Sequence, residues 1–323
     1  MTAFDEIRVE NMVIDFPVGG GLFRRNHLRA ANDVSLTLRA GEALAIVGES
    51  GSGKSNCARA ISRILTPTSG RIMVGGQDIL APGFREGRRD YAARVQVIFQ
   101  DPFGSLNPVH TIRHHIARPI RVYNPQLSPA QVEDRIIATL DRVGLAPAVQ
   151  TAGKYPYELS GGQRQRVAIA RALAVGARFI LADEPISMLD VSIRLGILNL
   201  MDDMKRDGIG FMDITHDFAT ARYFAERTAV RYLGHMVEWG DSDSVTQSPR
   251  HPYTQLLISA VPQPGRPRAQ ARPVRKADIA QRGPDSRGCP FAGRCPDTTD
   301  QCRAILPPVT KLEKDHHVRC HLY

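Results

Sequence analysis

Eight consecutive residues of this chain could bind a phosphate group. Residues 48–55 read Gly-Glu-Ser-Gly-Ser-Gly-Lys-Ser and fit the pattern G-x-x-x-x-G-K followed by Ser or Thr. Phosphate oxygens need several N–H donors that converge at close range, and glycines let the backbone curve without side chains in the way. The lysine adds a cation for the β- and γ-phosphates of a nucleotide, and the serine hydroxyl after it is a ligand for Mg²⁺. The candidate binding residues are Gly48, Glu49, Ser50, Gly51, Ser52, Gly53, Lys54 and Ser55.

The residues on either side of this loop have the pattern that a phosphate site requires. Residues 43–47 form a continuous apolar run, which is typical of a buried strand. A helix is predicted from residue 54 and ends near residues 67–70, so its positive dipole end would face the anion. Because the motif is informative only in a strand–loop–helix setting, this agreement favours a phosphate loop over a chance glycine–serine turn.

A second apolar run ends in two carboxylates. Residues 179–182 are Phe-Ile-Leu-Ala, a predicted strand, and Asp183 and Glu184 follow directly. An enzyme with a phosphate loop needs one carboxylate to hold the Mg²⁺ shell, and Asp183 suits this role. Glu184 would point elsewhere and could polarise the attacking water as a general base. Two solvated charges at a strand end are the alternative, which the presence of the phosphate loop disfavours.

The middle of the chain changes character. Between about residues 102 and 160 the strand signals fade, and residues 129–143 show helical spacing of apolar side chains. Ser128 is a plausible N-cap, and Pro129 stands at the first helical position. We therefore expect a helical lobe inserted into the domain that carries the phosphate loop.

The remaining pattern predicts strands and helices that alternate. Strands are expected at 7–16, 33–38, 72–74, 95–99, 210–214 and 229–238, and helices at 163–175 and 191–206. This order predicts an α/β fold, a P-loop NTPase core with an antiparallel β annex, the inserted helical lobe and a C-terminal extension that contains cysteines. We place an ATPase domain at residues 1–250 and the extension at residues 251–323.

Residues 159–173 read Leu-Ser-Gly-Gly-Gln-Arg-Gln-Arg-Val-Ala-Ile-Ala-Arg-Ala-Leu and resemble the signature motif of ABC transporter ATPases. A hydroxyl and glycine N–H groups at a helix start form a second anion site. The resemblance implies that two nucleotide-binding domains pack head to tail, and that each signature closes on the γ-phosphate held by the other phosphate loop. The signature residues would be Ser160, Gly161, Gly162 and Gln163.

Other elements of that family follow in the expected order. Gln100 resembles the glutamine that contacts Mg²⁺ or water and reports to the membrane subunits, and His216 resembles the switch histidine that contacts the γ-phosphate. Phe16 is the candidate to stack on adenine, with core packing of an early strand as the alternative. The resemblance implies ATP and Mg²⁺ as cofactors. Mg²⁺ would be held through Ser55, Gln100 and Asp183, and the catalytic residues would be Glu184, His216 and Gln100.

Residues 187–190, Ser-Met-Leu-Asp, resemble the D-loop of the same family, which places Asp190 at the dimer interface. The stretch departs from the family pattern at two positions. Met188 stands where Ala is more usual, and Ile186 stands where Thr is common. We expect neither change to stop hydrolysis, because every essential ATPase element is present.

A narrower resemblance covers nearly the whole chain. Residues 16–23, 101–108, 249–254 and 288–295 are similar to segments of the oligopeptide/dipeptide importer subfamily. This implies a subunit that hydrolyses ATP to power the import of peptides or a related solute. The subfamily also contains importers for nickel and for oligosaccharides such as β-glucosides, and these remain alternatives because fold likeness does not identify a cargo.

The same resemblance implies an assembly at a membrane. The partners would be a second ABC ATPase subunit, usually a paralogue, two transmembrane permease subunits and an extracytoplasmic substrate-binding protein. The sequence has no apolar run of about 18 residues that could span a membrane. Residues 1–10 lack the charged-then-apolar order of a signal peptide. We therefore expect a peripheral protein on the cytoplasmic face of the plasma (inner) membrane.

A net charge of +9 permits partners of another class, such as nucleic acid or acidic lipid. ABC ATPases that act on DNA or on ribosomes without a permease are the different-class alternative. They usually carry two cassettes or a long coiled-coil insertion, whereas this chain has one cassette and a short helical insert, so nucleic acid is not expected. An ATPase for export is a nearer alternative, which the importer-like C-terminal segments disfavour.

Four of the five cysteines lie close to the C-terminal end, and in a reducing cytoplasm such a group suggests metal before disulfides. Four thiolates can hold a 4Fe–4S iron–sulfur cluster, and zinc would also accept them, although structural zinc sites usually show closer cysteine pairs. The importer resemblance favours the iron–sulfur cluster, with free thiols as a third interpretation. The candidate ligands are Cys289, Cys295, Cys302 and Cys320. Additional candidate ligands close by are His316, His317 and His321. Cys57 lies alone on the helix after the phosphate loop, as a small packing residue.

Overall fold

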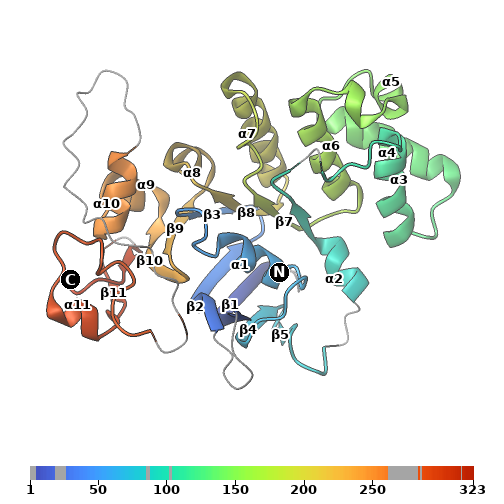
Figure 1. The fold of residues 1–323 in the computed structure, drawn as a ribbon. Helices are drawn as coiled ribbons and strands as arrows, with labels where there is room; N and C mark the ends of the chain where they lie inside the picture. The colour runs from blue at the N-terminus through green and yellow to red at the C-terminus, as the bar shows by residue number, and fades with distance from the viewer. Residues whose placement is uncertain are drawn as a thin grey trace. The chain divides into compact units, whose positions relative to one another are not determined.

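The computed structural model describes residues 5–18, 27–84, 88–101, 104–260, 283, 286–313 and 315–323. The chain divides into two compact units, and Figure 1 labels their helices and strands. The first unit contains residues 1–6, 38–43 and 81–214, and the second contains residues 7–37, 44–80 and 215–323. The predicted boundary between residues 250 and 251 falls inside the second unit and stays a prediction.

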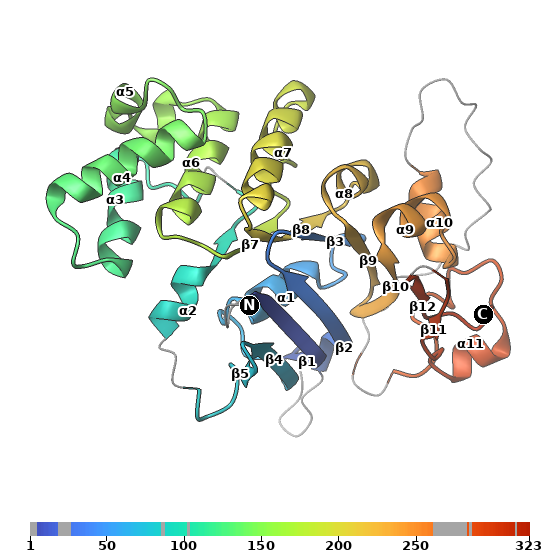
Figure 2. The ribbon, with the colours of Figure 1, turned by 180° about the vertical axis from the view of Figure 1, so that it is seen from behind.

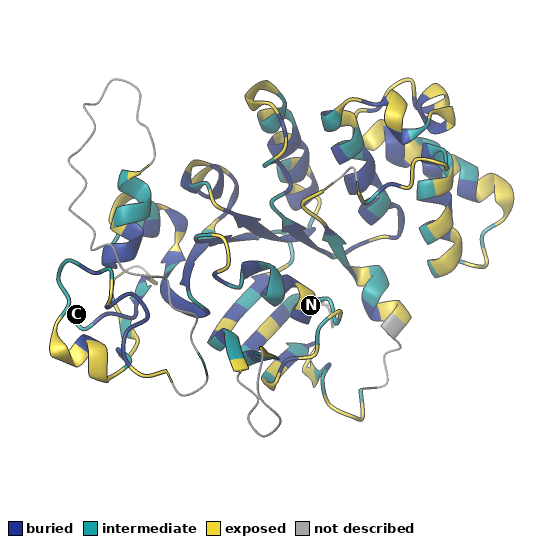
Figure 3. Ribbon diagram, in the orientation of Figure 1, coloured by how far each residue is buried: buried dark blue, intermediate teal, exposed yellow. Residues whose placement is uncertain are grey.

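The first unit contains three parallel strands. They are β6 (Val95–Ile98), β7 (Phe179–Asp183) and β8 (Gly210–Thr215), with β7 in the middle. Phe179 lies opposite Val95 on one side and Gly210 on the other. Both β7 and β8 are buried along almost their whole length (Figure 3), as expected for parallel strands with continuous apolar sequences.

The predicted helical lobe is present in the first unit. Helices α3, α4 and α5 lie in the predicted range of about residues 102–160, and α6, which follows it, packs against α3 and α4 (Figure 2). At the start of α4, the Ser128 hydroxyl accepts from the Gln131 N–H, and the Gln131 side chain accepts from the Ser128 N–H. This reciprocal cap fixes the helix start where the sequence places it. The helices of the unit are α2 (Arg88–Arg94), α3 (Ile112–Tyr123), α4 (Pro129–Arg142), α5 (Ala148–Gly153), the 3-10 turn η1 (Pro156–Glu158), α6 (Gly161–Ala174) and α7 (Val191–Arg206).

The second unit contains the predicted antiparallel annex as a separate four-stranded sheet. Its order is β2 (His27–Arg39), β1 (Glu6–Pro17), β4 (Ser69–Val74) and β5 (Gln77–Asp78). Strand β4 runs antiparallel to both of its neighbours. The mixed α/β fold class predicted from the sequence is thereby confirmed.

A second group of strands in this unit links the phosphate loop to the C-terminal end of the chain. The order runs β11 (Thr310–Lys311), β12 (His317–Val318), β10 (His235–Asp241), β9 (Arg227–Tyr232) and β3 (Ala43–Val47). Strand β3 is parallel to β9, and the other pairs are antiparallel. The C-terminal segment therefore extends the sheet that supports the loop. The helices of the unit are α1 (Lys54–Ile61), α8 (Phe218–Phe224), α9 (Ser242–Gln247), α10 (Pro252–Ser259) and α11 (Asp300–Ala304).

A buried carboxylate joins this extension to the sheet. The fully buried Glu238 side chain accepts from the backbone N–H groups of Arg250 (2.6 Å) and His251 (2.9 Å), and His316 Nε2 lies 2.7 Å from it. These bonds tie β10 to the start of α10 and to the chain before β12. A buried charge is stable only with such partners, so the contacts hold three segments together.

His251 is neutral in the folded protein. Burial lowers its pKa to about 3, and its Nδ1 accepts from the Tyr253 N–H at 3.1 Å, capping α10. In an unfolded chain the pKa is about 6.5. Because the folded value is the lower one, only the unfolded state gains a proton as pH falls below 6.5, so this group lowers the stability of the fold between about pH 6.5 and pH 3.

We predict that replacing His251 with Asn, whose side-chain oxygen can also cap α10, reduces this acid sensitivity. The stability lost between pH 7.5 and pH 5 should be smaller in the variant, by up to about 1.4 kcal/mol for each pH unit below 6.5. Urea unfolding at the two pH values measures the difference, with the exposed His27→Asn as control. Equal losses in the wild type and His251→Asn would contradict the prediction.

Candidate active site

The phosphate loop lies between a buried strand and a helix, as the sequence predicts. Strand β3 ends at Val47 with all five of its residues buried, and α1 begins at Lys54. Gly53 precedes the helix in the left-handed conformation, with φ of 86°. The loop is therefore a tight turn that leads directly into a helix N-terminus, where free N–H groups can bind an anion.

Two glycines are required in this loop because other backbone segments pass very close. A Cβ atom on Gly48 would lie 2.2 Å from the Arg231 carbonyl oxygen, and one on Gly53 would lie 2.1 Å from the Ala30 carbonyl oxygen. Gly51 also has a positive φ, of 80°, but a Cβ there would meet nothing within 4 Å. Gly48 and Gly53, the two glycines that define the motif, are thus the two loop positions where a side chain would collide with neighbouring backbone.

The charge of Lys54 is inside the loop. Its side chain is buried, and its ammonium donates to the carbonyl oxygens of Gly48 (2.5 Å) and Glu49 (3.0 Å). The cation is therefore held at the concave side of the turn, where a β- or γ-phosphate would be cradled.

A buried arginine that our sequence analysis did not single out supports the loop. The Arg231 guanidinium donates to the carbonyl oxygens of Gly53 (2.7 Å) and Ala30 (3.1 Å), and it contacts the Cys57 sulfur at 2.6 Å. Burial raises the pKa of the Cys57 thiol, which agrees with its predicted role as a packing residue. One signal could have indicated that Arg231 has a structural role. A charged side chain is unusual in a strand as buried as β9.

The second loop residue is held by the C-terminal part of the chain. The Glu49 N–H donates to the Tyr253 hydroxyl at 3.0 Å, and both Glu49 carboxylate oxygens accept from Arg294, at 2.9 and 3.0 Å. Burial raises the pKa of Tyr253 above its usual value, so this hydroxyl stays protonated. The residues lie far apart in the sequence, and no local pattern predicts their contact.

Two predicted catalytic residues meet in the first unit. The Gln100 amide donates to Glu184 Oε2 at 3.0 Å, although the residues are 84 positions apart. Glu184 directly follows β7, has a φ of +49°, and donates its N–H to the Ile214 carbonyl oxygen at 2.8 Å. A positive φ is costly for glutamate, and such strain concentrates at functional sites. The carboxylate is thereby turned away from the direction of the strand that ends at Asp183.

The signature residues form the start of α6. The Ser160 hydroxyl accepts from the Gln163 N–H (3.3 Å), and the Gln163 side chain accepts from the Ser160 N–H (3.0 Å). Gly162 is packed so closely that a Cβ would lie 2.6 Å from the Ile193 side chain. The cap fixes the helix N-terminus, which can present N–H groups to an anion.

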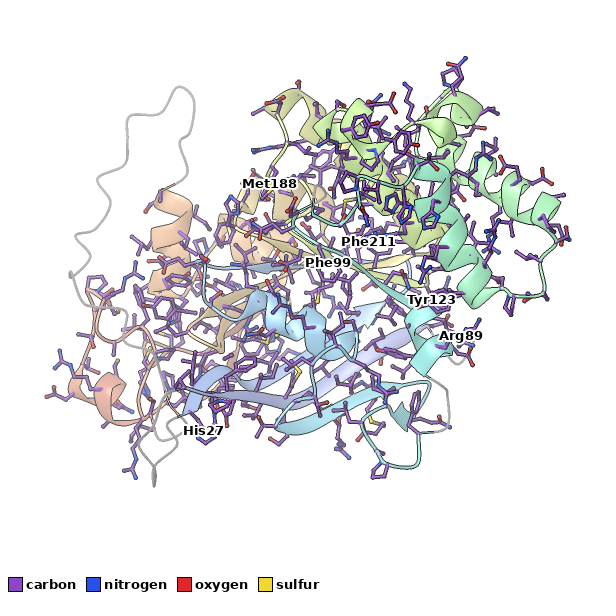
Figure 4. The ribbon with its side chains drawn as sticks, turned by 45° about the vertical axis from the view of Figure 1, so that its right-hand side comes forward. His27, Arg89, Phe99, Tyr123, Met188 and Phe211 are labelled. Atoms are coloured by element: carbon purple, nitrogen blue, oxygen red, sulfur yellow. The ribbon has the colours of Figure 1, made fainter. Side chains whose placement is uncertain are left out.

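Two residues of the D-loop and the switch histidine are exposed. Asp190 is exposed at the N-cap of α7, and Met188 is 56% exposed, whereas Ile186 is buried. Figure 4 labels Met188. His216 is exposed after β8, next to Asp217, which caps α8 by accepting from the Ala219 N–H. Phe16 is half-buried in β1. Phe16, residues 48–55 and His216 belong to the second unit; Gln100, Asp183, Glu184, the signature residues and Asp190 belong to the first.

The four C-terminal cysteines are gathered but do not form a metal site in this structure. All four are free and buried, and the Cys289 N–H donates to the Cys302 carbonyl oxygen at 2.7 Å. Burial, aided by neighbouring sulfurs, raises the pKa of Cys289 to about 12 and of Cys295 to about 11. Across the part of the chain that the structure describes, no three His, Cys, Asp or Glu side chains are arranged to hold one metal ion. The geometry therefore gives no support to the predicted cluster, since metal ligation needs thiolates that converge on one ion.

Comparison with known proteins defines the class. Residues 31–187 match the ABC transporter family, and residues 237–302 match the family described as oligopeptide/dipeptide transporter, C-terminal region. A dimeric ATP-binding cassette, MJ0796, solved in a post-hydrolysis state with ADP and Pi, has a TM-score of 0.64 and 28% identity over 73% of this chain and 98% of its own. The protein is thus an ATPase of the ABC transporter family.

Relatives along nearly the full length narrow the assignment. The chain is 41% identical to a probable peptide ABC transporter ATP-binding protein of Sinorhizobium fredii, over 98% of this chain and 89% of the relative. It is 39% identical to the oligopeptide transport ATP-binding protein AppF of Bacillus subtilis, over 95% and 94% of the two chains. The chain belongs to the ATP-binding subunits of the oligopeptide/dipeptide importer subfamily. No helix in the described ranges is sufficiently long and apolar to span a membrane.

We predict that Gly53→Ala abolishes ATP binding, because its Cβ would force the loop away from Ala30. The variant should also lose more stability than the roughly 1–2 kcal/mol that a left-handed alanine costs. Gly76→Ala, which lies outside the loop, is the matched control, since Gly76 has a similar φ of 79° and open space around the new Cβ. Equilibrium ATP binding and urea unfolding measure the two effects. Equal loss of binding in both variants would show that close packing at Gly53 is not the reason.

Proposed function

We propose that this chain hydrolyses ATP to power the import of peptides through an ABC transporter. The observation that carries this proposal is the likeness to peptide-transport ATP-binding proteins over nearly the whole chain, including the C-terminal region. A glutathione import ATP-binding protein of Escherichia coli is 46% identical over 82% of this chain and 42% of its own length. Short peptides are therefore favoured as cargo over nickel or β-glucosides.

The proposed roles of the residues follow from their chemistry. Lys54 and the N–H groups of the loop would bind the β- and γ-phosphates, and His216 would contact the γ-phosphate. The oxygen-bearing side chains of Ser55, Gln100 and Asp183 are the hard ligands that Mg²⁺ prefers. When bound, Mg²⁺ neutralises charge that develops on the phosphates.

Glu184 is proposed to accept the proton of the attacking water. The hydrogen bond from Gln100 fixes the orientation of the Glu184 side chain, and a carboxylate held in this way can act as a general base. The signature residues would stabilise the phosphoryl group bound to a partner subunit, because a helix N-terminus favours negative charge. Asp190 would contact that partner, and Phe16 would stack on the adenine ring.

We propose that the partners are a second ATPase subunit, a paralogue of this chain, two permease subunits and an extracytoplasmic substrate-binding protein. The helical lobe would contact the permeases at the cytoplasmic face of the inner membrane. A hollow of about 490 Å³ on α3 supports this role. It is lined by Thr111, Arg113, His114, Ala117, Arg118, Arg121 and Val122. Its basic side chains suit an acidic segment of a permease.

The role of Glu184 has a direct test. We predict that Glu184→Gln binds ATP as tightly as the wild type, because the amide is isosteric, but loses at least about 100-fold in turnover, because the amide cannot accept a proton. ATP affinity and steady-state phosphate release separate the two effects. Glu10→Gln, which removes a carboxylate paired with Arg71 on the antiparallel sheet, is the control and should hydrolyse ATP normally. Turnover retained in Glu184→Gln would remove this residue from its role.

The import function is tested by purification from membranes. We predict that the chain co-purifies with two permeases and a second ATPase, and that the reconstituted complex with its binding protein hydrolyses ATP faster when peptide is added. β-Glucosides or Ni²⁺ added alone should give no stimulation. A dimer without permeases that responds to none of these solutes would overturn the import assignment.

For the four C-terminal cysteines we propose a shared metal site, with an iron–sulfur cluster ahead of zinc, supported by the burial of all four thiols. Iron, sulfide and zinc analysis of the same complex, kept anaerobic, decides the matter, and a metal-free complex would refute the proposal.

A further inference from the structure

The C-terminal part of the chain reaches the phosphate loop through a pair of charges. We call residues 286–305, which contain three of the four clustered cysteines, the cysteine segment. Its Arg294, next to Cys295, forms a two-pronged ion pair with Glu49 in the loop. Two parallel N–H···O bonds to one carboxylate fix both distance and orientation, which a single contact does not.

Arg294 is held firmly on its own side of this pair. Its guanidinium lies 5.7 Å from the ring centroids of both Tyr232 and Phe291, and Nη1 also donates to the Tyr232 hydroxyl at 3.3 Å. The rings of Tyr232, Tyr253 and Phe291 pack together, with centroids 4.5 to 5.4 Å apart. Only 17% of the Arg294 side chain is exposed, so it is part of a packed cluster and not a mobile surface charge.

Glu49 is held from three directions. Its carboxylate binds Arg294, its N–H donates to Tyr253, and its carbonyl oxygen accepts from Lys54, the cation of the phosphate loop. A shift of Glu49 must therefore disturb the position of Lys54. Its carboxylate also adds a negative charge beside a site that would receive the negatively charged phosphates of ATP, and without a partner it would repel them.

We propose that Arg294 is a positioning residue for ATP binding, which neutralises and orients Glu49 so that the loop accepts phosphate. The proposal rests on the function of residues 48–55 as the ATP site. Arg294 acts through Glu49 and does not touch the nucleotide. The cysteine segment thereby sets the nucleotide affinity of the loop, and any change that displaces the segment weakens ATP binding.

The test is MgATP affinity in the purified full-length chain. Arg294→Met keeps the length and removes the charge, so the Kd for MgATP should rise about tenfold, the effect of one nearby uncompensated charge in a partly solvated site. Arg294→Lys keeps the charge but loses the two-pronged geometry, so its Kd for MgATP should lie between those of the wild type and Arg294→Met. Adding Glu49→Gln to Arg294→Met should restore the Kd to within about twofold of Glu49→Gln alone, since the repelling charge is gone.

The controls separate this proposal from simpler causes. Arg303→Met removes an exposed arginine of the same segment and should leave the Kd unchanged. The buried cysteines should react equally slowly with a thiol reagent in wild type and Arg294→Met, which shows that the segment stays folded. Lys54→Ala should abolish binding; a wild type that binds no better than Lys54→Ala would refute the ATP site itself. Wild-type affinity in Arg294→Met, or no rescue by Glu49→Gln, would overturn the role of Arg294.

Discussion

The arrangement of the second unit depends on one constraint. The backbone polar groups of the phosphate-binding turn need hydrogen-bond partners from other elements of the unit. A loop that directs its N–H groups at an anion cannot satisfy its own polar groups in a helix or sheet. Here Arg231 donates to the Gly53 carbonyl, Lys54 donates to that of Gly48, and Tyr253 accepts from the Glu49 N–H. These donors and acceptors come from β9, α1 and α10, so the packing of three elements determines the shape of the loop. A buried guanidinium is tolerated there because backbone carbonyls surround it.

The first unit meets a different constraint. The Glu184 carboxylate must point in a direction that a regular continuation of β7 would not give it. A residue that continued β7 would alternate between the two faces of the sheet. The left-handed conformation of Glu184 interrupts that alternation, and its N–H bond to Ile214 and side-chain bond from Gln100 offset the strain. The signature residues are positioned without a strained backbone conformation. Ser160 and Gln163 cap each other, and these hydrogen bonds fix the N-terminus of α6. In both cases, hydrogen bonds made by backbone N–H groups position the residues that the proposed chemistry needs.

Sequence patterns predicted the local elements well and the distant contacts poorly. The strand before the phosphate loop, the capped start of α4 and the bounds of α7 at residues 191–206 are all confirmed, because each has a periodicity or a cap within a few residues. The contacts of Arg231 with Gly53 and of Arg294 with Glu49 span 178 and 245 positions and leave no local pattern. Cysteine spacing indicated a metal site, but spacing does not determine how the sulfurs are arranged, and among the described residues no three such side chains are arranged to hold one ion.

The C-terminal extension is continuous with the ATP-binding sheet in this structure. Strand β12 pairs with β10, His316 contacts the buried Glu238, and Arg294 contacts the loop. Linkage between such sites is reciprocal, so if the extension raises the affinity of the loop for nucleotide, bound nucleotide must stabilise the extension by the same free energy. Under the proposed role of the Glu49–Arg294 pair, the stability of the extension would then rise when ATP is bound. Three of the cysteines lie within the cysteine segment and would be more protected when ATP is bound.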